Sequence, residues 1–356
     1  MNDIFFMKEA IKQAKNGVGF VNPNPLVGSI IVKNSKIIGT GYHKKFGNSH
    51  AEINALKQAG KKSENATIYI TLEPCFHHGK TPPCVDVIIS AGIKRCVIAS
   101  KDPNPKVNGK SIKKLRENGV EVDVSVCKEE AKEINKPFFK FIRTKLPFVY
   151  LKLGITLDGK IATASYNSKW ITNTSARHHS HQLRSKYMSL LVGANTIIKD
   201  NPSLTCRIKG KNNPYRIILD GNLKIPKTSK VLKNNEDKKT IIITSKDNKK
   251  KSINYNANFI FLKGKKFSFK EILVALGKLN IDSILVEGGN KIISQAFKEN
   301  IIDEGDIIVA PKIIGDSKAV SFVSGFSTNL IKDSIYLKNL EIKKIGNNVC
   351  FHFKKS

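Results

Sequence analysis

The chain has 356 residues, of which 40% are apolar and 25% are charged. That length exceeds what one hydrophobic core usually fills, so two domains are expected. No run of about 18 uncharged apolar residues is present to cross a membrane, which excludes a membrane-spanning helix. Residues 1–17 lack the basic start and cleavage site of a signal peptide, so the cytoplasm is the expected location.

The net charge of +32 raises the question of nucleic-acid binding. Only seven of the 61 basic residues are Arg, and the Lys residues are scattered along the whole chain. Surfaces that bind nucleic-acid phosphates tend to use Arg and to cluster their charge. We therefore expect no specific nucleic-acid partner and no membrane partner, although the charge can attract an anionic small substrate.

The first part of the chain alternates strand and helix signals. Apolar spacing predicts a helix over 3–16, and the pattern around Asn34-Ser35 predicts a hairpin of 27–33 with 36–43. Further helices are predicted at 51–59, 84–92 and 110–118, and further strands at 67–72, 95–100 and 120–126. This alternation is typical of an α/β layered sheet.

The alternation of strands and helices is interrupted at 132–147, a helical stretch that ends at Pro147. Strand and helix signals alternate again after it. We place a boundary near 143–147, which gives domains of residues 1–145 and 146–356. In the second domain, strands are predicted at 148–156 and near 189–193, 216–220, 240–244, 258–262, 283–287 and 306–310, and helices near 174–187, 268–278 and 290–298. The Lys/Asn-rich segments 233–239 and 245–252 are predicted as surface connections.

The strongest chemical signal is the motif HAE at 50–52, followed by Cys75 and Cys84. One imidazole, from His50, and two thiolates make a three-ligand zinc site whose fourth position stays open for water, as in catalytic zinc centres. Zinc lowers the pKa of water toward neutrality. Glu52 can take the proton of that water and deliver it to the substrate, an arrangement typical of zinc nucleobase deaminases. We expect one zinc ion per chain.

The two cysteines depart from the usual C-x-x-C spacing, because eight residues, FHHGKTPP, separate them. His77 or His78 as a fourth ligand would close the site. We favour the open site, because zinc-dependent deamination needs the free position.

The second half has a less specific signal. It contains no GxGxxG, and its best local feature is Glu287-Gly288-Gly289-Asn290 after an apolar strand, where a phosphate could approach backbone N–H groups. Many α/β proteins have such a turn for geometric reasons alone. The polar segment 195–207 is either a functional loop or a long connection.

The sequence resembles the RibD family of bifunctional riboflavin-biosynthesis enzymes. The resemblance covers both halves, in order, including the long cysteine spacing. The matching segments are PNPLVGSIIV (23–32), GTGYH (39–43), HAEINAL (50–56), TLEPCFHHGKTPPC (71–84), DPNPKVNGKS (102–111), LKLGITLDGKIA (151–162), SKWIT (168–172), GANTIIKDNPSLTCR (193–207) and LVEGGN (285–290).

The resemblance implies a cytidine-deaminase-like three-layer α/β/α domain followed by a dihydrofolate-reductase-like α/β domain. It also implies two reactions on a phosphorylated pyrimidine: hydrolytic deamination of 2,5-diamino-6-(5-phosphoribosylamino)pyrimidin-4-one, then NADPH-dependent reduction of the ribosyl group to a ribityl group. A homo-oligomer is compatible with the sequence.

The resemblance further implies residue roles. In the first domain, Asn24, His43, His77 and Lys80 would contact substrate; Phe76 and Lys80 stand where the family commonly has Ser and Arg. In the second, substrate contacts would come from Lys152, Ser168, Arg184, Leu204, Arg207 and Glu287. NADPH contacts would come from Gly154, Trp170, Thr196, Asp200, Gly221, Gly289, Asn290, Lys291, Ile292, Ile293, Ser294 and Gln295.

Two rival interpretations come from other classes of protein. The charge favours a nucleic-acid editing deaminase with a C-terminal binding module, but that protein would need clustered Arg or aromatic stacking platforms. A scaffold with two degenerate domains is the other rival, and the intact set His50, Glu52, Cys75 and Cys84 argues against it.

Overall fold

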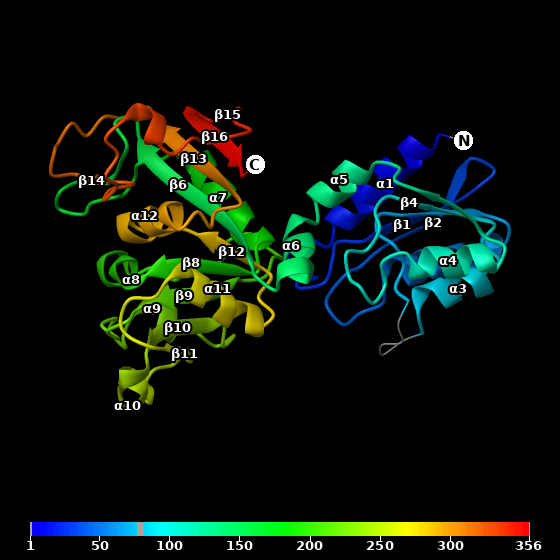
Figure 1. The fold of residues 1–356 in the computed structure, drawn as a ribbon, viewed down its shortest axis with the longest axis horizontal. Coiled ribbons are helices and arrows are strands. Elements are labelled where there is room, and N and C mark those ends of the chain that lie inside the picture. The colour runs from blue at the N-terminus through cyan, green and yellow to red at the C-terminus, as the bar shows by residue number, and fades with distance from the viewer. Residues whose placement is uncertain (1, 77–81, 356) are drawn as a thin grey trace. The chain divides into compact units, whose positions relative to one another are not determined.

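The computed structural model describes residues 2–76 and 82–355, and the chain folds as two compact units, Met1–Lys145 and Leu146–Ser356. Figure 1 shows each unit as a sheet flanked by helices.

The first unit is built on a sheet with the order β2-β1-β3-β4-β5 among the described residues. Strands β1 and β2 form the predicted hairpin, while β3, β4 and β5 run parallel. The strands are β1 (Gly28–Lys33), β2 (Lys36–Tyr42), β3 (Thr67–Ile70), β4 (Arg95–Ile98) and β5 (Glu121–Val124). The helices are α1 (Asp3–Lys15), α2 (Ala51–Ala59), α3 (Cys84–Ser90), α4 (Lys110–Glu117), α5 (Lys128–Glu133) and α6 (Lys136–Thr144).

Alternation of side chains along the strands gives this sheet two apolar faces. Ile31, Ile68 and Ile70 pack in one cluster with apolar residues of α2, α3 and α4. Ile30 and Tyr69 point to the other face, where α1 and α5 pack. The unit is therefore a three-layer α/β/α structure.

One predicted element of the first unit needs correction. The helical stretch 132–147 is two helices, α5 and α6, because the chain breaks at Asn135. The buried Asn135 side chain accepts a hydrogen bond from the Leu26 N–H and donates one to the Leu26 carbonyl, both at 2.8 Å. This tertiary pairing outweighs local helix propensity.

The second unit is built on a sheet with the order β11-β10-β9-β8-β12-β6-β13-β16-β15 among the described residues. The strands β11, β10, β9, β8, β12, β6 and β13 run parallel, and β16 and β15 add an antiparallel edge. The strands are β6 (Phe148–Thr156), β7 (Lys160–Ala162), β8 (Ser189–Gly193), β9 (Tyr215–Leu219), β10 (Thr240–Ser245), β11 (Asn258–Leu262), β12 (Ser283–Val286), β13 (Glu304–Ala310), β14 (Val320–Ser321), β15 (Glu341–Ile345) and β16 (Asn348–Lys354).

Helices cover both faces of this sheet. Helices α11 and α12 pack on the face formed by Leu151 and Ile284, whereas α7, α8 and α9 pack on the face of Tyr150 and Leu285. The helices are α7 (Thr174–Lys186), α8 (Ala194–Asp200), α9 (Lys230–Lys233), α10 (Lys249–Ser252), α11 (Phe269–Lys278) and α12 (Asn290–Lys298).

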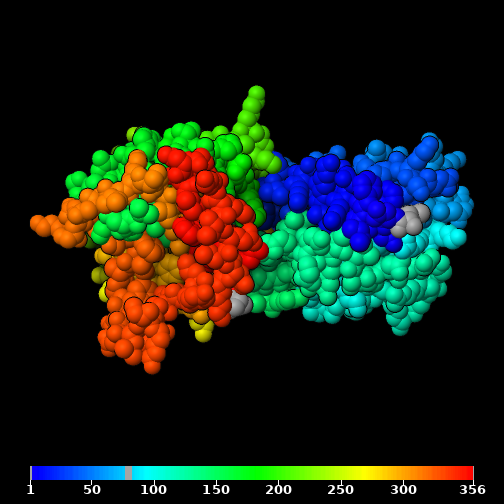
Figure 2. Space-filling view, turned by 90° about the horizontal axis from the view of Figure 1, so that it is seen from above, coloured from blue at the N-terminus to red at the C-terminus, as the bar shows by residue number. Residues whose placement is uncertain are grey.

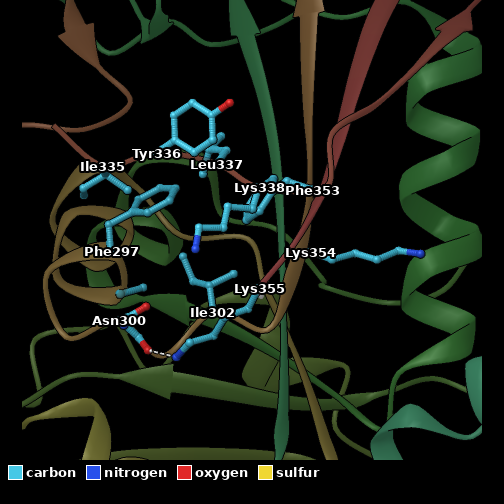
Figure 3. A pocket seen from close by; sticks show the side chains of 11 residues that line it. Phe297, Asn300, Ile302, Ile335, Tyr336, Leu337, Lys338, Phe353, Lys354 and Lys355 are labelled. Carbon is cyan, nitrogen blue, oxygen red and sulfur yellow. Dashed lines mark hydrogen bonds between the residues drawn. The ribbon is translucent and has the colours of Figure 1, made fainter. Parts of the chain in front are cut away.

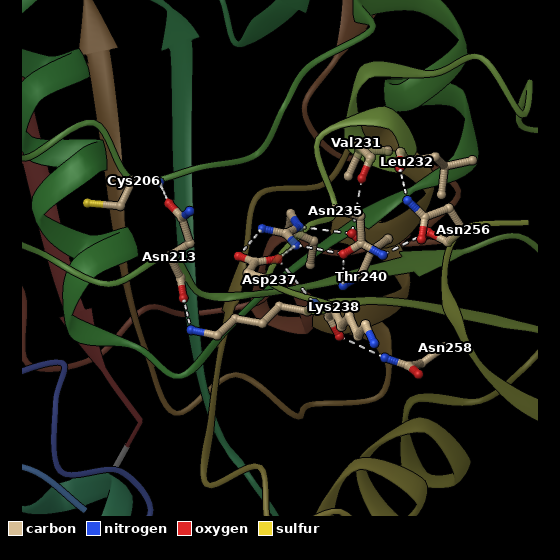
Figure 4. Close-up of polar contacts among 12 residues, drawn as sticks. Cys206, Asn213, Val231, Leu232, Asn235, Asp237, Lys238, Thr240, Asn256 and Asn258 are labelled. Atoms are coloured by element: carbon tan, nitrogen blue, oxygen red, sulfur yellow. Dashed lines mark hydrogen bonds and ion pairs between the residues drawn. The ribbon is translucent and has the colours of Figure 1, made fainter.

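The segment 233–239, predicted as a surface connection, is only partly that. The Asn235 side chain is buried, and its carbonyl oxygen accepts hydrogen bonds from the Thr240 N–H and from the guanidinium of the fully buried Arg216. Asp237 forms an ion pair with the same guanidinium (Figure 4). A buried charge must be paired, so this segment neutralises Arg216. Helix α8 and the hairpin of β15 and β16 are also absent from the sequence-based assignment.

Candidate active sites

Three predicted metal ligands converge at the ends of elements in the first unit. His50 directly precedes α2, Cys75 follows β3, and Cys84 begins α3. The His50 Nδ1 atom lies 3.2 Å from the Cys84 Sγ atom and 3.6 Å from the Cys75 Sγ atom. All three ligand atoms lie within 4.8 Å of one another, and among the described residues no other group of His, Cys, Asp and Glu does so.

The Cys75 segment is held by a buried carboxylate that sequence reasoning missed. Glu73 accepts backbone hydrogen bonds from Gly109 at 2.8 Å and Ser111 at 3.2 Å. The Ser111 hydroxyl donates to the Pro74 carbonyl at 2.7 Å. These bonds fix the residues just before Cys75, so the thiol is placed by rigid neighbours.

Glu52 lies in the first turn of α2, where its side chain is only 3% exposed. Its Oε2 atom is buried and has no hydrogen-bond partner among the described residues. Burial raises the pKa of this carboxyl. A buried, unpartnered carboxyl oxygen beside one imidazole and two thiols fits a centre that holds zinc and a reacting water, because the water would satisfy that oxygen.

Two predicted substrate contacts lie beside this centre. The rings of His43 and His50 meet edge to face, with centroids 5.5 Å apart. His43 Nδ1 lies 3.2 Å from the Ser49 carbonyl oxygen, and Asn24 Nδ2 lies 3.2 Å from His43 Nε2. Burial lowers the pKa of His43, so the ring is neutral near pH 7 and can accept the amide hydrogen bond of Asn24. The predicted contacts His77 and Lys80 lie outside the described residues.

The second unit contains a cavity of about 740 Å³ at the carboxyl ends of the parallel strands β8, β9 and β12. This is where open α/β sheets bind ligands. Many of the predicted NADPH contacts line it. They are Thr196, Asp200, Gly221, Gly289, Asn290, Lys291, Ile292 and Gln295, together with the predicted substrate contact Ser168.

The charge of this cavity suits an anionic ligand. Five lysines line it: the predicted contact Lys291, and four that sequence reasoning did not single out, Lys199, Lys224, Lys265 and Lys266. Helix α12 begins at its wall with Gly289 as N-cap and no capping side chain. Exposed N–H groups and the helix dipole at this end attract phosphate.

Glycines allow two close approaches at or beside the cavity. A Cβ atom at Gly221, in the cavity wall, would lie 1.9 Å from the Lys265 carbonyl oxygen, and one at Gly288, next to the lining residue Gly289, would lie 2.7 Å from Ile292. Neither clash involves the end of a flexible side chain. The local structure therefore requires glycine at both positions.

An ion cluster on the α7 side of the sheet joins three predicted substrate contacts. Arg184 donates to Glu287 through Nη2 at 2.5 Å and Nε at 3.3 Å, and Lys152 Nζ lies 3.5 Å from Glu287 Oε1. Burial acts to raise the pKa of Glu287, but the two cations outweigh it and lower the pKa to about 2. Sequence reasoning missed His181 beside this cluster, whose buried Nδ1 atom has no partner among the described residues.

The remaining predicted residues occupy varied surroundings. Trp170 is 62% exposed, and the Arg177 guanidinium carbon lies 4.5 Å from its ring centroid. Ile293 and Leu204 are buried, with 0% and 4% of their surfaces exposed. Three others are not among the residues that line the cavity: Gly154 lies against Thr172, the Ser294 hydroxyl accepts from the Ser324 N–H, and Arg207 is exposed.

Comparison with known families matches each unit to a separate family. The family "Cytidine and deoxycytidylate deaminase zinc-binding region" matches residues 1–100, and "RibD C-terminal domain" matches residues 147–351. These matches confirm the predicted α/β fold class with a cytidine-deaminase-like first domain. None of the helices that the structure describes has the length and apolar character to cross a membrane.

The chain is also similar to individual proteins over its full length. It is 44% identical to the riboflavin biosynthesis protein RibD of Aquifex aeolicus, covering 98% of each chain, and 34% identical to that of Escherichia coli, covering 99% of each. A Thermotoga maritima structure, described as a diaminohydroxyphosphoribosylaminopyrimidine deaminase/5-amino-6-(5-phosphoribosylamino)uracil reductase, is 39% identical with a TM-score of 0.89 over 99% of both chains.

Proposed function

Because the chain belongs to the RibD family of bifunctional deaminase/reductases of riboflavin biosynthesis, we propose that each unit performs one of the two reactions. The first unit hydrolyses the 2-amino group of 2,5-diamino-6-(5-phosphoribosylamino)pyrimidin-4-one to give 5-amino-6-(5-phosphoribosylamino)uracil and ammonia. The second unit reduces the ribosyl group of that product to ribityl phosphate with NADPH. The observation that carries this assignment is the unpartnered Oε2 atom of Glu52 beside three converging ligands, in a different unit from the cavity.

In the deaminase, His50, Cys75 and Cys84 would hold one zinc ion per chain, which supplies the Lewis acidity that makes water nucleophilic near neutral pH. Glu52 takes one proton from the attacking water and delivers it to the ring nitrogen, then carries a second proton to the departing amine. Burial raises the pKa of Glu52 and so favours its role as a proton carrier rather than a permanent anion.

Substrate placement in the first unit falls to Asn24 and His43. The Asn24 carbonyl oxygen can accept from the pyrimidine while its amide is held by His43. His77 and Lys80 remain predicted contacts for the phosphate.

In the reductase, NADPH in the cavity would supply the hydride that reduces C1′ of the opened ribose. At the N-terminus of α12, the cavity-lining run Gly289 to Ile292 would hold the pyrophosphate, and Thr196 and Asp200 line the same cavity. Ile293, Ser294 and Gln295 remain predicted contacts. Gly154, Trp170 and Gly221 complete the proposed cofactor contacts.

The ion cluster supplies the substrate contacts of the reductase. Arg184 and Arg207 would clamp the phosphate, because a guanidinium donates in a fixed fork. Lys152, held by Glu287, would contact the sugar carbonyl or imine. Ser168 and Leu204 are the further proposed contacts.

We propose that two copies associate through the apolar surface of residues 330–342 in the second unit. Ile331 is 91% exposed and Tyr336 82% exposed, and β15 at this edge has no strand partner on its outer side among the described residues. The C-terminal strands lie on the surface in Figure 2, and a pocket of about 250 Å³ beside Tyr336 is drawn in Figure 3. Exposed apolar surface of this kind is typical of interfaces. Light scattering should show a dimer, and Ile331→Lys should give a monomer.

The separation of activities is tested with two fragments, residues 1–145 and 146–356. The first should bind zinc and release ammonia from the diaminopyrimidine, and the second should oxidise NADPH when given the deaminated intermediate, because no residue proposed for either reaction lies in the other fragment. A folded second fragment that binds no NADPH would contradict the reductase assignment. A folded, zinc-loaded first fragment that deaminates only a free nucleoside would contradict the substrate assignment.

A further inference from the structure

A buried carboxylate–imidazole cluster lies on the α7 side of the second sheet and takes no part in either proposed reaction. Asp306 of β13 is 3% exposed and accepts hydrogen bonds from His179 Nε2 of α7 at 2.7 Å and from His352 Nδ1 of β16 at 2.9 Å. The Tyr150 hydroxyl of β6 lies 3.3 Å from the same His352 nitrogen. Asp306 is also the cross-strand partner of Lys152, a proposed substrate contact.

The bonds of this cluster are strong ones. Burial alone would raise the pKa of Asp306, but hydrogen bonds from His179, His352 and Tyr150 outweigh burial and hold the pKa well below its usual range. The carboxylate therefore stays ionised, and hydrogen bonds to an ionised group are shorter and roughly twice as strong as neutral ones. Because one Asp306 oxygen accepts from His179 of α7 and the other from His352 of β16, the cluster fixes one orientation of α7 relative to β13 and β16.

The same helix carries one proposed ligand contact after His179 and supports another through a residue before it. Arg184 lies five residues further along, about 7.5 Å at the helical rise, and bonds Glu287. Arg177 lies two residues before His179 and packs against the ring of Trp170. Any movement of α7 at His179 would therefore move these contacts as well.

We propose that Asp306 and His179 are positioning residues for the reductase, because they fix α7 so that Arg184 meets the phosphorylated substrate. This proposal rests on the proposed role of Arg184 in substrate binding. Displacement of a binding group by about 1 Å can cost up to 10²-fold in reaction efficiency. The effect should appear in KM, because Arg184 binds a part of the substrate that does not react.

The test compares His179→Leu with His179→Gln, whose amide nitrogen can take the place of Nε2. His179→Leu should raise the reductase KM for 5-amino-6-(5-phosphoribosylamino)uracil about tenfold, with kcat within about twofold. His179→Gln should restore KM to within about threefold of wild type. The matched control is His178→Leu, an exposed neighbour on the same helix, which should leave KM unchanged. Deaminase activity of each preparation should be unaffected.

An Arg184→Met variant separates failure of this proposal from failure of the proposed site. If it leaves KM unchanged, the substrate role of Arg184 is wrong and the positioning proposal falls with it. If it raises KM while His179→Leu lowers only the unfolding temperature, the site stands and the positioning role is overturned. Equal KM values for His179→Gln and His179→Leu would also overturn it. Should His179→Leu fail to fold, Asp306→Asn, which keeps the shape and removes the charge, should raise KM severalfold, and an unchanged KM would refute the proposal.

Discussion

Replacement of Glu52 by Gln should separate catalysis from stability in the first unit. Gln has the size of Glu but cannot carry a proton, and positioned acid–base groups contribute about 10²–10⁴-fold in rate. We therefore expect deamination to slow by at least about 100-fold, which corresponds to about 3 kcal/mol in activation free energy. Zinc content should be retained, because Glu52 is not a proposed ligand.

Although Glu52→Gln should lose activity, it should not lose stability when zinc is absent. The Oε2 atom of Glu52 has no partner to lose, and burial raises the carboxyl pKa above its ordinary value of 4.5. Folding therefore becomes less favourable as the pH rises above 4.5, and the cost levels off above the raised folded-state pKa at about 1.4 kcal/mol for each unit of the shift. Glu52→Gln removes this cost, so the zinc-free variant should unfold at a temperature no lower than wild type at pH 8. The gain should vanish near pH 4, where the carboxyl is protonated in both states.

Three measurements check this prediction: ammonia release, bound zinc, and NADPH oxidation with substrate that is already deaminated. The last should be unchanged, because the second unit does not contain Glu52. Glu64→Gln, an exposed glutamate of the same unit, is the control and should leave all three unchanged. Deamination at a rate close to wild type would refute the proton-carrier role, and joint loss of zinc and both activities would indicate a structural role instead.

Four further outcomes are expected. A Cys75→Ser, Cys84→Ser double variant should lose nearly all bound zinc, and stoichiometric zinc in metal analysis would refute the ligand assignment. Asp237→Ala leaves the buried Arg216 without its anion, so the free energy of unfolding measured in urea should fall by about 3 kcal/mol. A decrease below about 1 kcal/mol would contradict the pairing argument. Gly221→Ala forces the cavity wall apart, so titration should show at least about tenfold weaker NADPH binding, whereas unchanged affinity would show that the wall relaxes freely. Nucleic-acid binding should be weak, sequence-independent and steeply salt-dependent, and tight binding to one RNA at physiological salt would revive the editing-deaminase alternative.

Local sequence patterns were enough to predict the metal centre and most of the regular elements. His50, Cys75 and Cys84 lie within a short stretch of chain, and each stands at the end of an element that hydrophobic periodicity predicts. Periodicity also identified the parallel strands, because strands buried on both faces are continuous apolar runs. It could not find β15, whose residues are mostly exposed and carry no apolar alternation.

Which distant polar groups meet depends instead on the tertiary fold. Asp306, His179 and His352 are separated by long stretches of chain, and none lies in a pattern that indicates a partner. They meet because the sheet places β16 beside β13 and α7 packs across that face. Asp237 likewise lies in a segment with the composition of a surface loop. This segment leads into β10, which pairs with β9, and the buried Arg216 of β9 therefore meets Asp237. Hydrophobic burial fixes the order of strands, and hydrogen-bond partners are chosen only once that order has brought them within about 3 Å.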